Sequence, residues 1–377
     1  MEFRLSYEKV LEVSDFFKEN LQNNNFENNG IVYIGMDAGW AKMSDEQLAD
    51  IARHCKANGQ KAGIYFTPFS DWGKDPEAYI NGNSGYKCKD AYLYANGKTQ
   101  NMVAGGLAMD PTHPAIKERI RETAERFKRL GYEYIKIDFL THGCAEADYY
   151  YDPEVQTGMQ AYNKGMAYLL EQMEGMYITM AISPLFPSQY AHSRRIACDA
   201  WAGIGDTEYT LNSLTYGWWL NQVYTYNDPD HLLLEPVSDG ENRARITSGV
   251  ITGIFMNGDD LSYISGIQVA KDKARKFLTN EDINAIAKMG KSFRPVNGNM
   301  DGADFLFMYD TGKEVYLAAF NYSGYDLTYD LPLSRLGLRE FSTYKAKELW
   351  SGKEVKFKKN VRVCIPKKDV LVFRIMR

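Results

Sequence analysis

The chain has 377 residues, of which 45% are hydrophobic and 25% are charged, and its net charge is −5 at pH 7. These values are typical of a folded protein of about two domains, and they exclude the collagen-like, coiled-coil and disordered classes. No Lys/Arg-rich run marks a nucleic-acid partner, no stretch of 18 apolar residues marks a membrane span, and five scattered cysteines without a CxxC pair argue against a zinc ribbon or a full disulfide framework.

The N-terminal residues carry charges throughout and lack the apolar segment of a signal peptide. We therefore expect a cytoplasmic protein if the chain is complete, and a secreted or periplasmic one if its N-terminus has been shortened. Assembly into a homo-oligomer stays open at this point.

Strand-like and helix-like segments alternate over the first two-thirds of the chain. Apolar spacing predicts a helix from Ser6, a capping box at Ser44 and Gln47 predicts the start of a second helix, and Pro114 predicts the start of a third. Strands are predicted at 31–36, 61–66, 132–138, 176–181, 195–200, 231–236 and 249–255. This repetition favours a parallel (β/α)8 barrel of the TIM type, because no GxGxxG loop follows the first strand as in a doubly wound sheet.

The pattern changes after about residue 292. Short alternating runs separated by Gly, Pro, Asn and Asp follow one another to the end of the chain. Such runs are typical of an antiparallel β-sandwich. We therefore predict a catalytic barrel over residues 1–291 and a C-terminal β-sandwich domain over residues 292–377.

Polar side chains fall at the C-terminal ends of the predicted strands. Asp37, Tyr65, Asp138 and Asp199 each end a strand, on the face away from its apolar residues. In a parallel barrel these strand ends surround one mouth, and this mouth is where barrel enzymes have their active sites. The polar residues therefore predict a site there.

Two of these carboxylates suit glycoside cleavage. Lys136 is two residues from Asp138 on the same strand face, and a cation at that distance lowers the pKa of a carboxyl group by roughly 1–3 units. Asp138 is therefore expected to stay ionised, as a nucleophile must. Asp199 has Arg195 four residues before it, farther off along a strand. Two carboxyl groups whose pKa values differ meet the requirement for cleavage through an oxocarbenium-like transition state.

Other chemistries fit less well. An alternative metal site could draw on Asp37, Asp138, Asp199, His113 and His142, but no HxH or HxxxH spacing occurs. A serine nucleophile is disfavoured because the sequence has no GxSxG. Since two carboxylates supply both nucleophilic and proton-transfer chemistry, no cofactor and no metal are expected.

At these residues the sequence resembles glycoside hydrolase clan D, the α-galactosidase and α-N-acetylgalactosaminidase group, closest to family 27 and related to family 36. The resemblance is carried by YIGMDAGW, GIYF, YIKIDF, RRIACDAW and YNDPDHL, in this order, and by the C-terminal sandwich. The Lys-x-Asp motif of the family carries its nucleophile, and the Arg-x-x-x-Asp motif carries its acid/base. The resemblance therefore implies that Asp138 is the nucleophile and Asp199 the acid/base, with sugar contacts from Asp37, Trp40, Tyr65, Lys136, Arg195 and Asp230.

Three positions depart from the family pattern. Ala38 stands where the family has a second acidic residue, and the loop that reads the 2-substituent of the sugar is ISPLF at 182–186. The first barrel strand of the family, with its Gly-Trp-Asn-Ser-Trp, is absent, so the barrel is expected to lack that strand.

The resemblance implies a retaining hydrolase of terminal α-linked, galactose-like sugars, with a carbohydrate as its partner. Two alternatives stay open. One is another specificity of the clan, such as α-N-acetylgalactosaminidase, α-glucan hydrolase or β-L-arabinopyranosidase. The other is a glycan-binding homologue with impaired catalysis.

Overall fold

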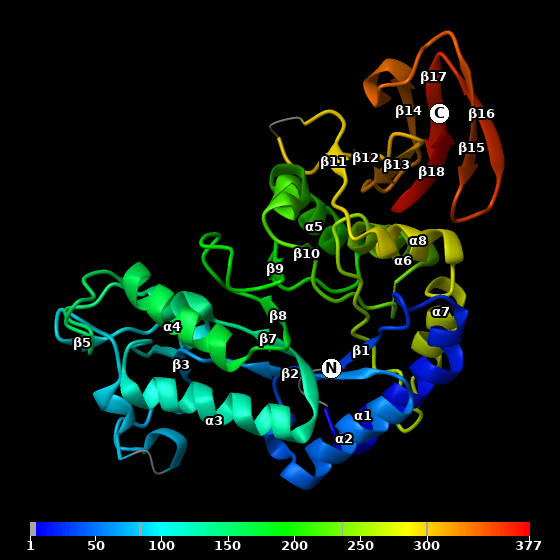
Figure 1. The fold of residues 1–377 in the computed structure, drawn as a ribbon. Coiled ribbons are helices and arrows are strands. Elements are labelled where there is room, and N and C mark those ends of the chain that lie inside the picture. The colour runs from blue at the N-terminus through cyan, green and yellow to red at the C-terminus, as the bar shows by residue number, and fades with distance from the viewer. Residues whose placement is uncertain (1–4, 83–84, 236, 299–300) are drawn as a thin grey trace. The chain divides into compact units, whose positions relative to one another are not determined.

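The computed structural model describes residues 5–82, 85–235, 237–298 and 301–377. Its architecture is that of a (β/α)8-type barrel followed by an antiparallel β domain (Figure 1). Two compact units divide the chain: one holds Ile31–Arg194 with the N-terminal residues up to Ser14, and the other holds Asp15–Gly30 and Arg195–Arg377.

Capping residues mark where helices of the barrel region begin and end. Ser44 accepts the N–H of Gln47 at 3.3 Å while the Gln47 side chain accepts the N–H of Ser44 at 3.0 Å, so the predicted capping box is formed. Gly131 ends the third helix in the left-handed conformation, with φ of 98°. The helices are α1 (Tyr7–Phe16), α2 (Asp45–Ala57), α3 (Pro114–Leu130), α4 (Gly158–Gln172), α5 (Ile204–Gly217), α6 (Asp239–Val250), α7 (Gln268–Phe277) and α8 (Glu281–Met289).

The main sheet has the strand order β1-β2-β7-β8-β9-β10, and its four strand pairs from β1 to β9 are parallel. The strands are β1 (Tyr33–Gly35), β2 (Lys61–Phe66), β7 (Tyr132–Ile137), β8 (Tyr177–Met180), β9 (Ser193–Arg195) and β10 (Tyr226–Asp228). Two isolated parallel bridges, Asn227↔Gly253 and Leu232↔Asn257, continue this arrangement beyond β10. Within the described residues the barrel is thus built from six strands and one bridged segment, as expected for a barrel without its first strand.

Three predicted strands are wrong, and the first of them, at 195–200, shares only Arg195 with β9. Leu232 forms only a single bridge in the predicted strand 231–236, whose last residue lies outside the described part of the chain, and the strand lies earlier, at β10. Gly249 and Val250 belong to α6 rather than to a strand at 249–255. The latter two segments are apolar because they are buried, and burial alone does not distinguish a helix end from a strand.

Short strands outside the main sheet shape the loops that follow β2. They are β3 (Ser70–Asp71), which pairs with β6 (Leu107–Ala108), and β4 (Tyr94–Ala95), which pairs with β5 (Lys98–Thr99). The β3–β6 pair is antiparallel and ties the loop directly after β2 to the segment that leads into α3.

The C-terminal region forms an eight-stranded sheet in the order β11-β12-β13-β18-β15-β16-β17-β14. β14 alternates more and less exposed residues, whereas β13 is buried over nearly its whole length, and the core includes Leu317, Phe357, Phe373 and Ile375. The strands are β11 (Arg294–Pro295), β12 (Leu306–Asp310), β13 (Glu314–Asn321), β14 (Leu327–Pro332), β15 (Thr343–Glu348), β16 (Glu354–Lys358), β17 (Asn360–Ile365) and β18 (Asp369–Met376). The predicted antiparallel β domain is confirmed, and the boundary at 291/292 stays a prediction.

No helix of the described residues combines the length and the apolar character that crossing a membrane requires.

Candidate active site

Four of the predicted site residues meet at the ends of β1, β2 and β7, and we call them the Asp138 cluster: Asp37, Tyr65, Lys136 and Asp138. Asp138 directly follows the last residue of β7 and is 8% exposed. The Tyr65 hydroxyl donates to Asp138 Oδ2 at 3.2 Å, and the N–H of Phe139 donates to Asp138 Oδ1 at 2.7 Å. Both carboxylate oxygens therefore have a donor, which fixes the direction of the carboxyl group.

The polar pair beside this carboxylate is an ion pair. Lys136 Nζ lies 2.6 Å from Asp37 Oδ2, and it also lies over the ring of Tyr65, 5.4 Å from the ring centroid. The two side chains are only 16% and 30% exposed. A half-buried pair of opposite charges presents both hydrogen-bond donors and acceptors, and sugar hydroxyl groups can bind to both. The predicted effect of Lys136 on the pKa of Asp138 stays a prediction.

The backbone is unusual directly after Asp138. Phe139 has φ of 54° and ψ of 35°, the left-handed conformation, which is rare for a bulky side chain. Such conformations cost about 1–3 kcal/mol and occur mostly at functional sites. Here the bend directs the N–H of Phe139 at the carboxylate of Asp138, so the strained residue contributes to orienting the predicted nucleophile.

Trp40 contacts the backbone of one member of this cluster, Tyr65. Its Nε1 donates to the carbonyl oxygen of Tyr65 at 2.8 Å, while its ring packs edge-on against Phe127 and beneath the guanidinium of Arg126. These contacts anchor the indole to α3. The predicted role of Trp40 as a sugar contact stays a prediction.

The remaining three predicted residues, Arg195, Asp199 and Asp230, lie together with Asp228 and His231. We call these five residues the Arg195 cluster. The Arg195 side chain is 6% exposed. Its Nη2 lies 2.7 Å from Asp230, its Nη1 lies 3.0 Å from Asp199, and its Nε lies 3.7 Å from Asp228. One guanidinium thus faces three carboxylates.

The Arg195–Asp199 contact is closer than the sequence predicts. Strand β9 ends at Arg195 itself, so residues 196–199 leave the strand and the chain brings Asp199 back to the guanidinium. Asp199 is 68% exposed, whereas the Asp228 and Asp230 side chains are each 2% exposed. Asp199 is therefore the carboxylate among these three that is open to solvent.

The buried members of the Arg195 cluster stabilise each other's charged forms. Burial acts to raise the pKa of Asp230, but the hydrogen bond from His231 and the charge of Arg195 lower it below its ordinary value. Burial likewise acts to lower the pKa of Arg195, and the neighbouring carboxylates reverse this and raise it. Asp230 also accepts the N–H of Ala200 at 2.8 Å, so its contacts fit a residue that holds Arg195 and the chain before Asp199 in place.

Sequence reasoning missed two members of this cluster. Asp228 is the first residue of the Asp-Pro-Asp turn and His231 follows that turn, whose turn-forming character concealed that Asp228 ends strand β10. The rule that selected Asp37 and Asp138, a polar residue at the C-terminal end of a strand, would also have selected Asp228.

The loop at 182–186 is held by a side chain from β9. Ile182 has φ of 41°, and its carbonyl oxygen accepts the N–H of Thr141 at 2.9 Å. Arg194 donates to the Ser183 hydroxyl at 3.0 Å and to its carbonyl oxygen at 2.6 Å. The loop is therefore ordered by its own contacts and presents the exposed apolar residues Ile182, Leu185 and Phe186.

Among the described residues there is no group of three or more His, Cys, Asp or Glu side chains arranged to hold a metal ion. His113 and His142 of the alternative metal set are buried, and burial lowers the pKa of both imidazoles. Each of them lies among aromatic rings.

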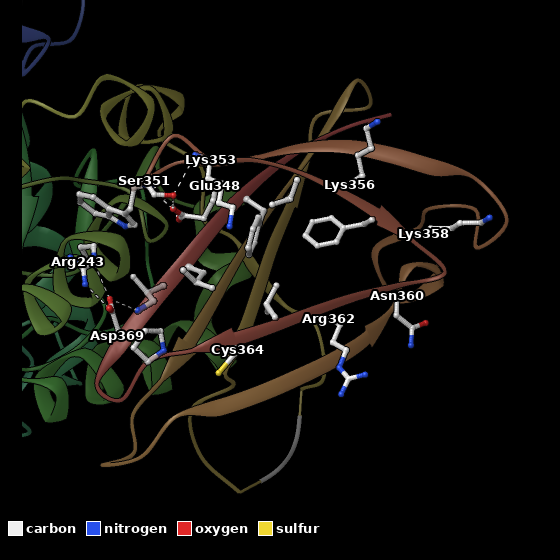
Figure 2. A pocket seen from close by; sticks show the side chains of 18 residues that line it. Arg243, Glu348, Ser351, Lys353, Lys356, Lys358, Asn360, Arg362, Cys364 and Asp369 are labelled. Atoms are coloured by element: carbon white, nitrogen blue, oxygen red, sulfur yellow. Dashed lines mark hydrogen bonds and ion pairs between the residues drawn. The ribbon is translucent and has the colours of Figure 1, made fainter.

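A hollow of about 820 Å3 lies in the C-terminal domain, where β16 and β17 diverge from their single paired position at Lys358 and Asn360 (Figure 2). Its two acids are used by the fold: Asp369 accepts from Arg243 at 3.0 Å, and Glu348 accepts the N–H of Ser351 at 2.7 Å. None of the predicted site residues lines it.

Comparison with known proteins agrees with this fold. Residues 308–375 match the family described as the alpha galactosidase C-terminal beta sandwich domain. A family 27 β-L-arabinopyranosidase from Geobacillus stearothermophilus is 13% identical, with a TM-score of 0.76, over 99% of this chain and 93% of that one. α-Galactosidase I from Mortierella vinacea is 12% identical, with a TM-score of 0.65, over 99% and 93%.

The isomalto-dextranase of Arthrobacter globiformis, complexed with panose, is 16% identical, with a TM-score of 0.65, over 98% of this chain and 69% of that one. The chain thus has the fold of solved family 27 glycoside hydrolases, its C-terminal region matches the α-galactosidase sandwich domain, and the predicted resemblance to clan D is confirmed.

Proposed function

We propose that this protein is a retaining glycoside hydrolase that removes a terminal α-linked, galactose-like sugar. The observation that carries the proposal is the placement of Asp138. It stands at the C-terminal end of a barrel strand, is nearly buried, and has a hydrogen-bond donor on each carboxylate oxygen. A carboxylate fixed in this way is ready for attack in one direction, which lowers the entropic cost of the reaction.

In the proposed reaction Asp138 attacks the anomeric carbon, and a covalent glycosyl-enzyme forms as the bond to the leaving oxygen breaks. Asp199 gives a proton to that oxygen. It then takes a proton from a water molecule, which attacks the anomeric carbon and releases Asp138. The exposure of Asp199 suits this role, since a water molecule must reach this carboxylate once the leaving group has departed. The reaction requires no cofactor.

Retention makes a geometric demand on these two residues. In retaining enzymes the two carboxyl groups are about 5–5.5 Å apart, whereas inverting enzymes separate them by about 6.5–9.5 Å. We therefore propose that Asp138 and Asp199 are the two carboxyl groups of a retaining mechanism, with residues 1–291 as the catalytic domain and 292–377 as the C-terminal domain. Asp37, Lys136, Tyr65, Trp40 and Arg195 would contact the sugar, and Asp230 would hold Arg195.

The specificity is the open part of the proposal. One similar structure is a β-L-arabinopyranosidase, and another is an isomalto-dextranase. β-L-Arabinopyranose has the ring configuration of α-D-galactose without the exocyclic carbon, so one site can accept both sugars.

A panel of nitrophenyl glycosides tests the proposal: α-galactoside, α-N-acetylgalactosaminide, α-glucoside and β-L-arabinopyranoside. We expect one or two of these to be cleaved by the wild type. Asp138→Asn should lower kcat by at least about a thousandfold, because the amide keeps the shape of the side chain and loses its nucleophilicity. Equal, low activity in both proteins would instead favour the glycan-binding alternative.

A further inference from the structure

An exposed indole packs against Phe139, the residue that follows the predicted nucleophile. Trp72 follows β3, in the loop after β2, and is 41% exposed. Its Nε1 donates to the hydroxyl of Thr67 at 3.1 Å, and Thr67 is itself buried. The ring is therefore fixed in the plane that this hydrogen bond sets, although much of its surface faces solvent.

Two further contacts support the ring from beneath. Phe139 packs edge-on against it with ring centroids 4.7 Å apart and an interplanar angle of 73°. Gly106 approaches it so closely that a Cβ atom at this position would lie 3.0 Å from the six-membered ring of Trp72 and 2.9 Å from His142 Nε2. Only glycine leaves room for this packing, so the backbone at 106 is shaped to the indole.

A single exposed aromatic residue is ordinary, and exposure alone would indicate nothing. Trp72 differs because it is rigid and because its support is the residue that orients Asp138. Phe139, held in the left-handed conformation, contacts the indole with its ring and the carboxylate of Asp138 with its N–H. A rigid aromatic face is an effective binding surface, since little conformational entropy is lost when a ligand stacks on it.

The position of Trp72 indicates which part of a substrate it meets. Asp138 directly follows β7, whereas Trp72 lies in the loop after β2, and of its neighbours Gly106 precedes β6 and His142 belongs to the short helix Leu140–Cys144. An oxygen of Asp138 that attacks a sugar from the strand end displaces the leaving group on the opposite face of the anomeric carbon, on the side away from the strand.

From this arrangement we infer that Trp72 is the stacking platform for the leaving group, and that this leaving group is itself a sugar ring. The inference rests on the proposed function and deepens it, because it makes a disaccharide or longer α-glycoside the natural substrate class. The apolar face of a pyranose, made of its C–H groups, would lie on the exposed face of the indole.

Two substrates of the same sugar separate this role from others: the α-glycosyl fluoride, whose leaving group is too small to reach Trp72, and the matching α-linked disaccharide. Trp72→Ala should lower kcat/KM for the disaccharide about tenfold and leave kcat/KM for the fluoride within about twofold. Trp72→Phe keeps an aromatic face and should lose less. Phe341→Ala, which removes a 96% exposed ring of the C-terminal domain, is the matched control and should change neither substrate.

Equal losses for the two substrates would overturn the inference, because they would show that Trp72 only supports Phe139 and Asp138. No loss with either substrate would also overturn it. Circular dichroism and the thermal midpoint of Trp72→Ala and Trp72→Phe establish that the variants are folded.

A binding readout makes the test independent of turnover. In the Asp138→Asn background, calorimetric titration with the disaccharide should give a Kd about tenfold higher when Trp72 is also replaced by alanine. If the wild type cleaves neither substrate, the proposed function fails, while this titration still decides whether Trp72 binds a sugar. Equal affinity of the Asp138→Asn variant and the Asp138→Asn, Trp72→Ala double variant for the disaccharide would refute the inference that Trp72 binds the leaving group.

Discussion

Replacing Arg195 by methionine should destabilise the protein strongly and weaken the pH dependence of stability that comes from Asp230. The guanidinium is the cation that faces Asp230 at 2.7 Å and Asp228 at 3.7 Å, and both carboxylates are 2% exposed. Removing one partner of a buried charge pair typically costs about 3–5 kcal/mol, because the remaining charge stays buried and uncompensated. We expect a loss of this size at pH 7.

The pH dependence follows from the direction of the pKa of Asp230. In the wild type that pKa is lowered, so the stability it contributes is fully present above the pKa of an unfolded aspartate, about 3.9, and is lost as the pH falls through the lower folded value. In Arg195→Met, burial still raises the pKa of Asp230, and the hydrogen bond from His231 still lowers it, but the charge of Arg195 no longer does, so this pKa should be higher than in the wild type. The destabilisation of the variant relative to the wild type should therefore grow as the pH rises through this higher pKa.

Urea unfolding of the wild type and Arg195→Met at pH 4 and pH 7 measures both effects. Asp230→Asn in the Arg195→Met background should recover part of the loss, since it removes a buried negative charge that no longer has the guanidinium beside it. Arg53→Met serves as a control, because Arg53 and its partner Asp50 form an exposed pair, and should leave the midpoint unchanged. A loss below about 1 kcal/mol at pH 7, or no recovery in the double variant, would refute the reasoning.

Three further substitutions test the Asp138 cluster and the barrel. Tyr65→Phe removes the hydroxyl that donates to Asp138, and kcat should fall between about tenfold and hundredfold; an unchanged kcat would exclude this orienting role. Lys136→Met breaks the ion pair with Asp37, which follows β1, and steady-state kinetics should show KM raised about tenfold with a smaller effect on kcat. Gly63→Ala places a Cβ atom 2.3 Å from a tyrosine ring of β7 and should cost about 1–3 kcal/mol in urea unfolding, whereas Gly205→Ala, with open space around it, should cost nothing.

Much of the Asp138 cluster could be predicted because it depends on strand period and strand ends. β2 and β7 have six residues each, long enough for alternation to show which side chains share a face, and Tyr65, Lys136 and Asp138 emerged from that pattern. β9 has three residues, and its end at Arg195 was not visible in the sequence. The direct Arg195–Asp199 contact was missed for this reason.

The contacts among the loops that hold Trp72, Gly106 and Phe139 could not be predicted from the sequence, for a different reason. Trp72 and Gly106 are far apart in the chain, and the antiparallel β3–β6 pair brings their loops together. The left-handed conformation of Phe139 also has no sequence signal, since aromatic residues rarely adopt it. Tertiary packing supplies both features, and local patterns carry no information about them.

The most direct test of the central claim is to identify the residue that becomes covalently bound to the sugar. A 5-fluoro glycosyl fluoride of the sugar selected by the nitrophenyl panel slows release of a glycosyl-enzyme, so mass spectrometry of peptic peptides can locate the bound sugar. We expect the label on the peptide that contains Asp138, and no label on the Asp138→Asn variant. A label on another residue, or an inverted product detected by NMR without any labelled peptide, would contradict the proposed mechanism.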